Sequence, residues 1–156
     1  MPTTLTPYLS FRGNTREVFA FYAQALGAEI QAMLRFAEMP APPVGNDGCA
    51  GGQLPGAEGA EAAGDGIMHA CLALPGGALL MAGDVPPGMP FDGMQGVMLA
   101  LQYDTVAQAE QAFAALLPGG QVTMPLAPAF WARTFGMLTD RFGVSWAVNG
   151  EPLPMA

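Results

Sequence analysis

The sequence contains no lysine, so its five Lys and Arg residues are all arginines. It also contains only one histidine and only two cysteines. Thirteen acidic residues give the chain a net charge of −8. A nucleic-acid phosphate backbone would meet mostly repulsion from this charge, and nucleic acid is therefore not an expected partner. Cys49 and Cys71 do not show the spacing of metal ligands, and we expect both to be reduced thiols in a cytoplasmic protein.

Long apolar runs are missing as well. None approaches the ~20 residues that a membrane-spanning helix needs, and residues 1–10 lack the basic and apolar regions of a secretion signal. We expect a protein that neither spans a membrane nor is exported. A chain of 156 residues is long enough for one domain, residues 1–156, made of two small halves that share a core.

The stretch Pro7–Ile30 predicts a strand, a helix and the start of a second strand. Asn14 has the position of a helix N-cap with Glu17 completing a capping box, and Gly27 ends the helix. From Ala28 to Phe36, apolar residues alternate with polar ones as in a half-buried strand. The predicted apolar face of the helix consists of Val18, Phe19, Tyr22 and Leu26, and that of the second strand consists of Ile30, Ala32, Leu34 and Phe36.

The segment Pro40–Gly66 is rich in glycine, proline and alanine, contains no basic residue and cannot build a core. Two interpretations are open. The segment is either a mobile insertion between two strands or a lid over a ligand site, since long loops without secondary structure in compact domains are often functional.

After this insertion the sequence predicts a hairpin, a proline-rich link, and then a strand, a helix and three further strands. Thr105 and Gln108 can form a second capping box where the helix starts. We expect a buried strand at residues 96–103 and an aromatic turn at residues 125–131. The hairpin strands are predicted at residues 67–74 and 78–82, the helix at 104–117, and the last three strands at 121–124, 134–139 and 144–149.

Both halves therefore run strand, helix, strand, strand, strand. Such a unit leaves one face of its sheet apolar and uncovered, so two units must pack together to close a core. We predict an α+β fold of two βαβββ modules whose curved sheets enclose a cavity, with a ferredoxin-like sandwich as the alternative. The modules span about residues 5–84, with the insertion at 40–66, and about residues 95–150. Sliding one half along the other matches Ala70 with Gly136, Leu72 with Leu138, Gly77 with Gly143, and Leu80 with Trp146.

His69, the only histidine, lies in an apolar strand and has two interpretations. It is either a buried neutral imidazole bonded to a neighbour, or a cavity-facing proton donor or ligand-orienting group. Cys71 has the same strand parity and points to the same side. Neighbours two apart on a strand seldom align for proton transfer, so a nucleophilic thiol with an imidazole base is not expected.

Aromatic side chains are the other candidates for a ligand site, because sites for small organic molecules are usually built from them. Core packing explains the same residues equally well. Arg133 either binds an anionic group of a ligand or lies at the surface in a salt bridge. Asp140 and Arg141 fall in a hairpin turn and are interpreted as structural. The aromatic candidates are Tyr8, Phe11, Phe130, Trp131 and Trp146.

Three stretches carry a resemblance to a known family: Pro7–Ile30 with FYAQALG, Ile67–Leu74 with IMHA, and Val122–Asn149 with VTMPL, FGMLTDRFG and WAVN. With these stretches and its paired βαβββ pattern, the chain resembles the vicinal oxygen chelate superfamily. That superfamily includes glyoxalase I, extradiol dioxygenases, fosfomycin-resistance transferases and bleomycin-binding proteins. Within it the chain looks like the PhnB-like family, some of whose members are labelled demethylubiquinone methyltransferases. The resemblance implies a homodimer.

The resemblance also implies positions for a divalent metal, which the superfamily holds with His, Gln or Glu from the first and last strands of each module. In this chain those positions fall near Pro7, Met81, Met98 and Ala147. A hard or borderline metal needs imidazole or carboxylate ligands, so we predict no metal site and no cofactor.

Two functions follow from these observations. The first is a PhnB-like protein that binds a small organic molecule in an aromatic-lined cavity without a metal. The alternative is a metal-dependent lyase, dioxygenase or transferase of the superfamily, using an unpredicted metal site or His69. Whether the chain is an enzyme is left open by the sequence.

Overall fold

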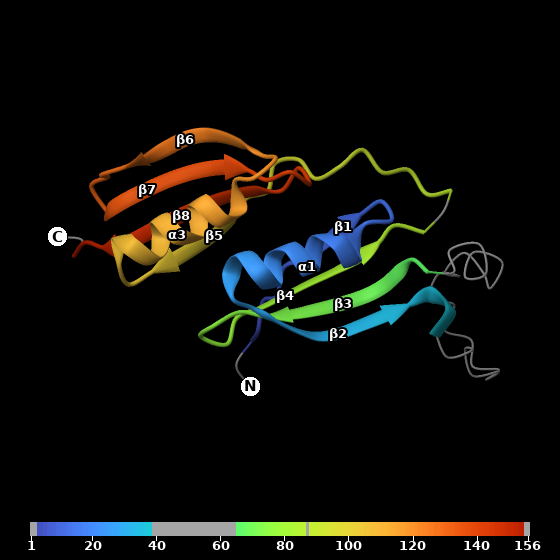
Figure 1. The fold of residues 1–156 in the computed structure, drawn as a ribbon. Coiled ribbons are helices and arrows are strands. Elements are labelled where there is room, and N and C mark those ends of the chain that lie inside the picture. Colours follow the sequence, from blue (N-terminus) through green and yellow to red (C-terminus); the bar gives the residue numbers. More distant parts are fainter. Residues whose placement is uncertain (1–2, 39–64, 87, 155–156) are drawn as a thin grey trace. The chain divides into compact units, whose positions relative to one another are not determined.

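The computed structural model describes residues 3–38, 65–86 and 88–154 (Figure 1). These residues form two units. The first consists of Met1–Ala20 and Glu29–Asp92, and the second consists of Phe21–Ala28 and Gly93–Ala156. The boundary falls inside helix α1 (Thr15–Leu26), so the last residues of this helix belong to the second unit.

The first unit contains a four-stranded sheet in the order β1-β4-β3-β2. Strands β1 and β4 run parallel, and the other two pairs are antiparallel. A short 3-10 turn, η1 (Phe36–Glu38), follows the edge strand β2. The strands are β1 (Tyr8–Phe11), β2 (Glu29–Arg35), β3 (Ile67–Ala73) and β4 (Leu79–Asp84).

The second unit repeats this arrangement, with the strand order β5-β8-β7-β6 and a parallel β5-β8 pair. The predicted α+β fold of two βαβββ modules is therefore confirmed. It differs from a ferredoxin-like sandwich, in which the strands of both halves share one sheet. The elements are β5 (Leu99–Tyr103), α3 (Val106–Leu116), β6 (Gln121–Ala127), β7 (Ala132–Thr139) and β8 (Ser145–Pro152).

The predicted repeat appears in the strand register. Leu72 pairs with Leu80 in the first sheet, and Leu138 pairs with Trp146 in the second. The residues matched by sliding the two halves of the sequence thus occupy equivalent places in two hairpins of equal length.

Helix α1 begins and ends where the sequence predicts. The Val18 N–H donates to the Asn14 carbonyl at 3.0 Å, the first hydrogen bond of the helix. At the other end, Gly27 has a φ of +62°, and the Ala28 N–H donates to the Ala23 carbonyl at 3.0 Å. This is the pattern of a glycine C-cap. No helix in the described part of the chain is long and apolar enough to cross a membrane.

Helix α3 is capped as predicted, by the side chain of Thr105. The Gln108 N–H donates to the Thr105 hydroxyl oxygen at 3.2 Å, and that hydroxyl lies 3.1 Å from Gln108 Oε1. The buried face of α3 is formed by two alanine side chains, one leucine and one phenylalanine. It consists of Ala109, Ala112, Phe113 and Leu116.

Asp84 holds the start of α1 against the first sheet. Its buried carboxylate accepts hydrogen bonds from the Thr15 N–H at 3.0 Å, the Thr15 hydroxyl at 2.7 Å and the Ile67 N–H at 2.7 Å. The carboxylate therefore joins the helix N-terminus to β3 and β4, and α1 lies on the face of the sheet that carries Asp84. The apolar residues buried on that face are Leu9, Phe11, Ala70, Leu72, Leu80 and Ala82.

Asp140 has a similar role in the second unit. Its carboxylate, whose residue is 3% exposed, accepts from the Tyr22 hydroxyl, from Trp146 Nε1 at 2.8 Å, and from the N–H groups of Phe142 and Val144 at 2.9 and 3.1 Å. One side chain thus closes the β7–β8 turn and joins it to the last turns of α1. The structural interpretation of Asp140 is supported by all four contacts.

Arg141, the next residue, packs on aromatic rings of the same unit. Its guanidinium carbon lies 5.5 Å from the ring centroid of Phe21 and 5.0 Å from that of Phe142. These are cation–π distances, and they support a structural role for Arg141 as well.

The second predicted strand forms as β2, but its predicted apolar face is wrong. Between Ile30 and Ala32 the register with β3 shifts by one residue, so Gln31 is bulged and later side chains change faces. Leu34 therefore lies with His69 on the face opposite Ile30, and Ile30 and Leu34 are 39% and 44% exposed on this edge strand. Phe36 lies beyond the strand, in η1.

Two strands of the second unit also differ from prediction. Strand β5 is shorter than expected and alternates between half-buried and exposed residues, because it is an edge strand. Strand β6 continues through Pro125 to Ala127, where a turn was expected. Proline donates no ladder hydrogen bond, and β6 tolerates it because it is an edge strand whose register is irregular between Met124 and Ala127.

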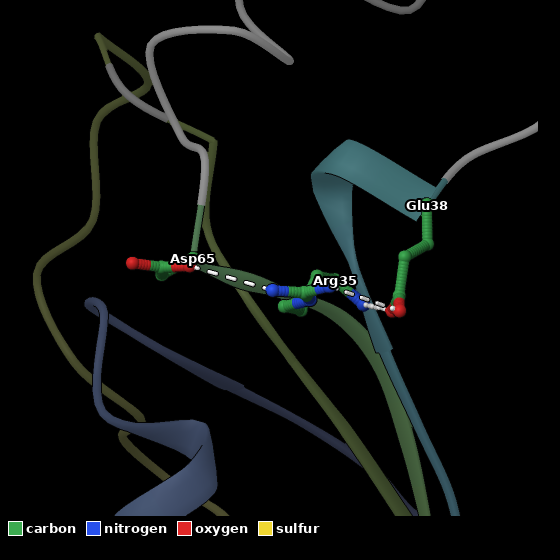
Figure 2. Close-up of polar contacts among 3 residues, drawn as sticks. All are labelled: Arg35, Glu38 and Asp65. Atoms are coloured by element: carbon green, nitrogen blue, oxygen red, sulfur yellow. Dashed lines mark hydrogen bonds and ion pairs between the residues drawn. The ribbon is translucent and has the colours of Figure 1, made fainter.

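Most of the predicted insertion lies outside the described residues, but its two ends are joined. The Phe36 N–H donates to the Gly66 carbonyl at 3.0 Å. The Arg35 guanidinium lies between Glu38, at 3.2 Å, and Asp65, at 3.7 Å (Figure 2). The Arg35 backbone N–H also donates to Glu38, and this hydrogen bond lowers the pKa of that carboxyl group. These contacts therefore hold together the residues at which the chain leaves β2 and enters β3.

Replacing the tyrosine that binds Asp140 should destabilise the protein. Tyr22→Phe leaves the buried carboxylate one donor short, and hydrogen bonds to charged groups contribute about 1.5–3 kcal/mol. We expect a loss of that size in the free energy of unfolding measured by urea denaturation. Tyr103→Phe, at a half-buried tyrosine of the same unit, is the control and should cost less. Equal losses in the two variants would contradict the role given to Asp140.

Candidate functional site

Each sheet has one face that carries a helix and one that does not, and the candidate residues divide between them. In the first sheet, side chains at odd positions of β3 and β4 point away from Asp84 and α1, because successive strand residues alternate. We call this side the helix-free face of the first sheet. The strand register places on it Tyr8, Ala32, His69, Cys71 and Met81.

Tyr8 and His69 contact each other on this face. The Tyr8 hydroxyl lies 3.3 Å from His69 Nδ1 and 3.3 Å from the Met68 carbonyl oxygen. The two rings are stacked, with centroids 5.8 Å apart and planes inclined by 25°. Partial burial raises the pKa of Tyr8, so its hydroxyl stays protonated and remains a donor near neutral pH. His69 is half-buried on the helix-free face, and its imidazole contacts the Tyr8 hydroxyl.

Cys71 shares the helix-free face with His69, as strand parity predicts. Its side chain is buried at 8% exposure and is a free thiol. The other cysteine of the sequence, Cys49, lies outside the described residues.

In the second sheet, the helix-free face is the one opposite α3. Gly150 faces α3 so closely that a Cβ there would lie 2.6 Å from Ala109 Cβ. Its neighbour Asn149 therefore points to the other side. Asn149 pairs with Gln102 on β5 and with Phe135 on β7, so these three side chains form a row across adjacent strands.

Trp131 and Phe130 extend this row with aromatic rings. The Trp131 indole N–H donates to Asn149 Oδ1 at 2.9 Å. The Trp131 ring meets Phe135 and Phe130 edge-on, with centroids 5.1 and 4.6 Å apart. Phe130 is 80% exposed. The helix-free face of the second sheet thus carries an aromatic wall next to a side-chain amide.

Arg133, a candidate for binding an anionic ligand, forms an ion pair. Its Nε lies 2.6 Å from Glu151 Oε1, and both side chains are partly exposed. Glu151 has a φ of +54°, and it is the one residue other than glycine with positive φ in the described part of the chain. The salt-bridge interpretation of Arg133 is therefore the one that the geometry supports.

Phe11 and Trp146 lie on the helix-covered faces of their sheets. Phe11 is 3% exposed and Trp146 is 1% exposed. Trp146 packs edge-on against Tyr22, with centroids 5.2 Å apart, and donates to Asp140. Both residues are packed as core residues, and neither lies beside the Tyr8 and His69 pair or the Trp131 and Asn149 pair.

The strand positions corresponding to metal ligands do not carry suitable donors. Of the predicted positions, Pro7 and Met98 precede β1 and β5, whereas Met81 and Ala147 lie on the helix-free faces. Met81 pairs there with Tyr8, and Ala147 pairs with Ala100. A phenol, a thioether and two methyl groups do not fit a divalent cation, which prefers imidazole or carboxylate. Among the residues that the structure describes, no three His, Cys, Asp or Glu side chains are grouped so as to hold a metal ion. No step of a mechanism can be derived through a metal at these positions.

Sequence reasoning missed Asn149 and Gln102. The signal was present, because Asn149 lies two residues after Ala147, a position expected to face the interior. A polar residue of the same parity in an apolar strand is a candidate for recognition. Its hydrogen bond to Trp131 could not be read from the sequence, since the two residues are eighteen positions apart.

The chain matches known proteins over most of its length. Residues 4–148 match the family described as the Glyoxalase/Bleomycin resistance protein/Dioxygenase superfamily. Protein PA1353 from Pseudomonas aeruginosa, of known crystal structure, is 42% identical, with 95% of this chain and 97% of that chain covered and a TM-score of 0.77. YjdN of Escherichia coli strain K12 is 33% identical over 147 residues, which is 93% of each protein.

A structure with lower identity has the same fold. It is a putative 3-demethylubiquinone-9 3-methyltransferase, PhnB protein, from Bacillus cereus, 23% identical, with 94% of this chain and 98% of that chain covered and a TM-score of 0.66. This likeness extends to the fold alone.

The two tryptophans give a direct test of the site geometry. Asn149→Leu removes the acceptor of the Trp131 indole N–H, so this proton should shift in a two-dimensional proton–nitrogen NMR spectrum and exchange faster with solvent. The Trp146 indole proton, bonded to Asp140, should not change and is an internal control. An unchanged Trp131 signal in the variant would contradict the hydrogen bond.

Proposed function

Because the chain belongs to the Glyoxalase/Bleomycin resistance protein/Dioxygenase superfamily, we propose that it binds a small organic molecule on the helix-free faces of its sheets without a metal. The residues proposed to contact ligand form two groups, each within one unit: Tyr8 and His69 in the first, and Phe130, Trp131 and Asn149 in the second. The proposal includes pairing of two identical chains and a cytoplasmic location. The pairing rests on the family resemblance, and the location rests on Cys71, a free thiol in the structure.

The hydrogen bond between Trp131 and Asn149 carries the proposal. An indole N–H only donates, so the atom of Asn149 that faces it must be the amide oxygen. The Asn149 NH2 group is thereby turned away from Trp131, and its two donors have no protein acceptor among the described residues. A ligand oxygen is a suitable acceptor for this fixed amide.

The surrounding rings define the rest of the ligand. Trp131, Phe130 and Phe135 offer aromatic surface beside the amide. Aromatic walls with a few fixed polar groups are typical of sites for small organic molecules. The nearby cation, Arg133, is already paired with Glu151. We therefore expect a planar, uncharged ligand that carries a carbonyl oxygen.

A fragment screen tests this function. With saturation-transfer NMR on aromatic amides, ketones and lactams, wild type should bind members of the set, and Trp131→Ala should weaken binding at least tenfold. A tenfold loss is ~1.4 kcal/mol. This lies within the range expected for losing an aromatic contact together with the indole that orients the Asn149 amide.

Val97→Ala is the matched control, since Val97 is an apolar residue of the same unit with 61% exposure and lies outside the row. It should bind as wild type does. No binding by wild type, or equal losses in the two variants, would contradict the proposed site.

An enzyme of the superfamily is the second candidate, and the Tyr8 and His69 pair favours it. Histidine is the residue that most often transfers protons in enzymes, and the Tyr8 hydroxyl contacts this imidazole at 3.3 Å. Such an enzyme would use either His69 or a metal held elsewhere than at Met81 and Ala147.

Metal analysis separates the metal-free proposal from a metal-dependent enzyme. Elemental analysis of protein purified without chelators should find less than about one tenth of an equivalent of any divalent metal. Stoichiometric metal, lost together with ligand binding after chelation and restored by adding the metal back, would favour the enzyme and contradict the metal-free proposal.

A further inference from the structure

Tyr8, His69 and the Met68 carbonyl form a hydrogen-bonded group at the end of β3. The pairing of β3 with β4 ends at Ala70 and Ala82, so the Met68 carbonyl lies beyond the ladder. Buried or half-buried backbone groups at such ends need other partners. The Asp84 carboxylate accepts a hydrogen bond from the Ile67 N–H, and the Tyr8 hydroxyl donates one to the Met68 carbonyl at 3.3 Å.

This arrangement fixes the direction of the hydrogen bonds. A carbonyl oxygen only accepts, so the Tyr8 hydroxyl must donate its single proton to Met68 if that contact is made. Tyr8 then has only lone pairs to offer His69, and Nδ1 at 3.3 Å must carry the imidazole proton. The other nitrogen, Nε2, is left as an unprotonated acceptor in the neutral ring.

Gly83 makes the arrangement sterically possible. A Cβ at this position would lie 2.5 Å from the Met68 carbonyl oxygen and 3.0 Å from the Tyr8 hydroxyl. Any side chain there would push the phenol away from the carbonyl. A glycine in the interior of a strand weakens it, so its presence at this point is consistent with a close approach of groups that the site needs.

We infer that His69 is held as its Nδ1–H tautomer and accepts a hydrogen bond at Nε2 from a weakly acidic O–H or N–H group of the bound ligand. The inference rests on the proposed small-molecule binding and adds to it the chemical class of one ligand group. Tyr8 is a positioning residue, because it acts on the ligand through His69. The ligand group expected at His69 is therefore a phenol, enol or imide proton, carried by a ring that can lie against the exposed Tyr8 side chain.

The sole histidine of the chain makes the tautomer directly observable. In a long-range proton–nitrogen NMR spectrum of nitrogen-15 labelled full-length protein, all imidazole signals come from His69. Wild type should show the Nδ1–H pattern at a pH where the ring is neutral. Tyr8→Phe keeps the stacked ring and removes the hydroxyl, so the spectrum should move towards the Nε2–H pattern. Tyr103→Phe, in the other unit, should leave it unchanged.

A pair of probes that differ by one proton tests the ligand class. para-Cyanophenol has an acidic hydroxyl, and para-methoxybenzonitrile has the same planar body without it. The phenol should shift His69 Nε2 on titration and bind about tenfold more tightly than the ether, as expected for one hydrogen bond. In Tyr8→Phe the preference should fall to less than about threefold.

Three results would overturn the inference: an Nε2–H tautomer in wild type, equal binding of the two probes, or no change of the His69 signals with either probe at millimolar concentration. The first is measured without any ligand and leaves the proposed function untouched. Equal binding of both probes would support small-molecule binding while removing His69 from it. Failure of the proposed function is instead registered by the fragment screen on Trp131→Ala.

Discussion

The carboxylate of Asp140 accepts hydrogen bonds from two side chains and two backbone N–H groups, and the packing of the second unit depends on it. A buried carboxylate is costly unless its lone pairs are satisfied, so the Tyr22 hydroxyl and the Trp146 indole are constrained to their positions. Burial and the neighbouring carboxylate raise the pKa of Tyr22, which keeps this hydroxyl a donor. Asp84 acts in the same way at the start of α1.

These two carboxylates fix the helices on one face of each sheet, and the proposed ligand contacts lie on the other faces. With the helices fixed on one side, the side chains of opposite parity have no helix to cover them. On those faces the structure has Tyr8 with His69 and Trp131 with Asn149, each pair joined by a polar contact. The fold thus provides rigid strands as a support, and the polar contacts orient the groups that a ligand would meet.

The sequence predicted the fold well because its signals were local and repeated. Gly27, Thr105 and the spacing of the hairpins are short-range features, and the match of Leu72 and Leu80 with Leu138 and Trp146 fixed the register. The bulge at Gln31 and the extension of β6 through Pro125 depend on pairing with neighbouring strands, so alternation alone gave the wrong face and the wrong length.

The site was predictable only in part. Strand parity placed His69 and Cys71 together, but Phe11 and Trp146 looked like ligand residues because composition does not distinguish the two faces of a sheet. The partners of Arg133 and Asn149 are distant in sequence and came from the structure.

A crystal structure of the protein soaked with aromatic carbonyl fragments would test the central claim most directly. The account predicts fragment density on a helix-free face, with a ligand oxygen about 3 Å from Asn149 Nδ2. It predicts no anomalous peak for a metal at that place. Fragments bound only elsewhere, or a metal peak within bonding distance of the fragment, would contradict it.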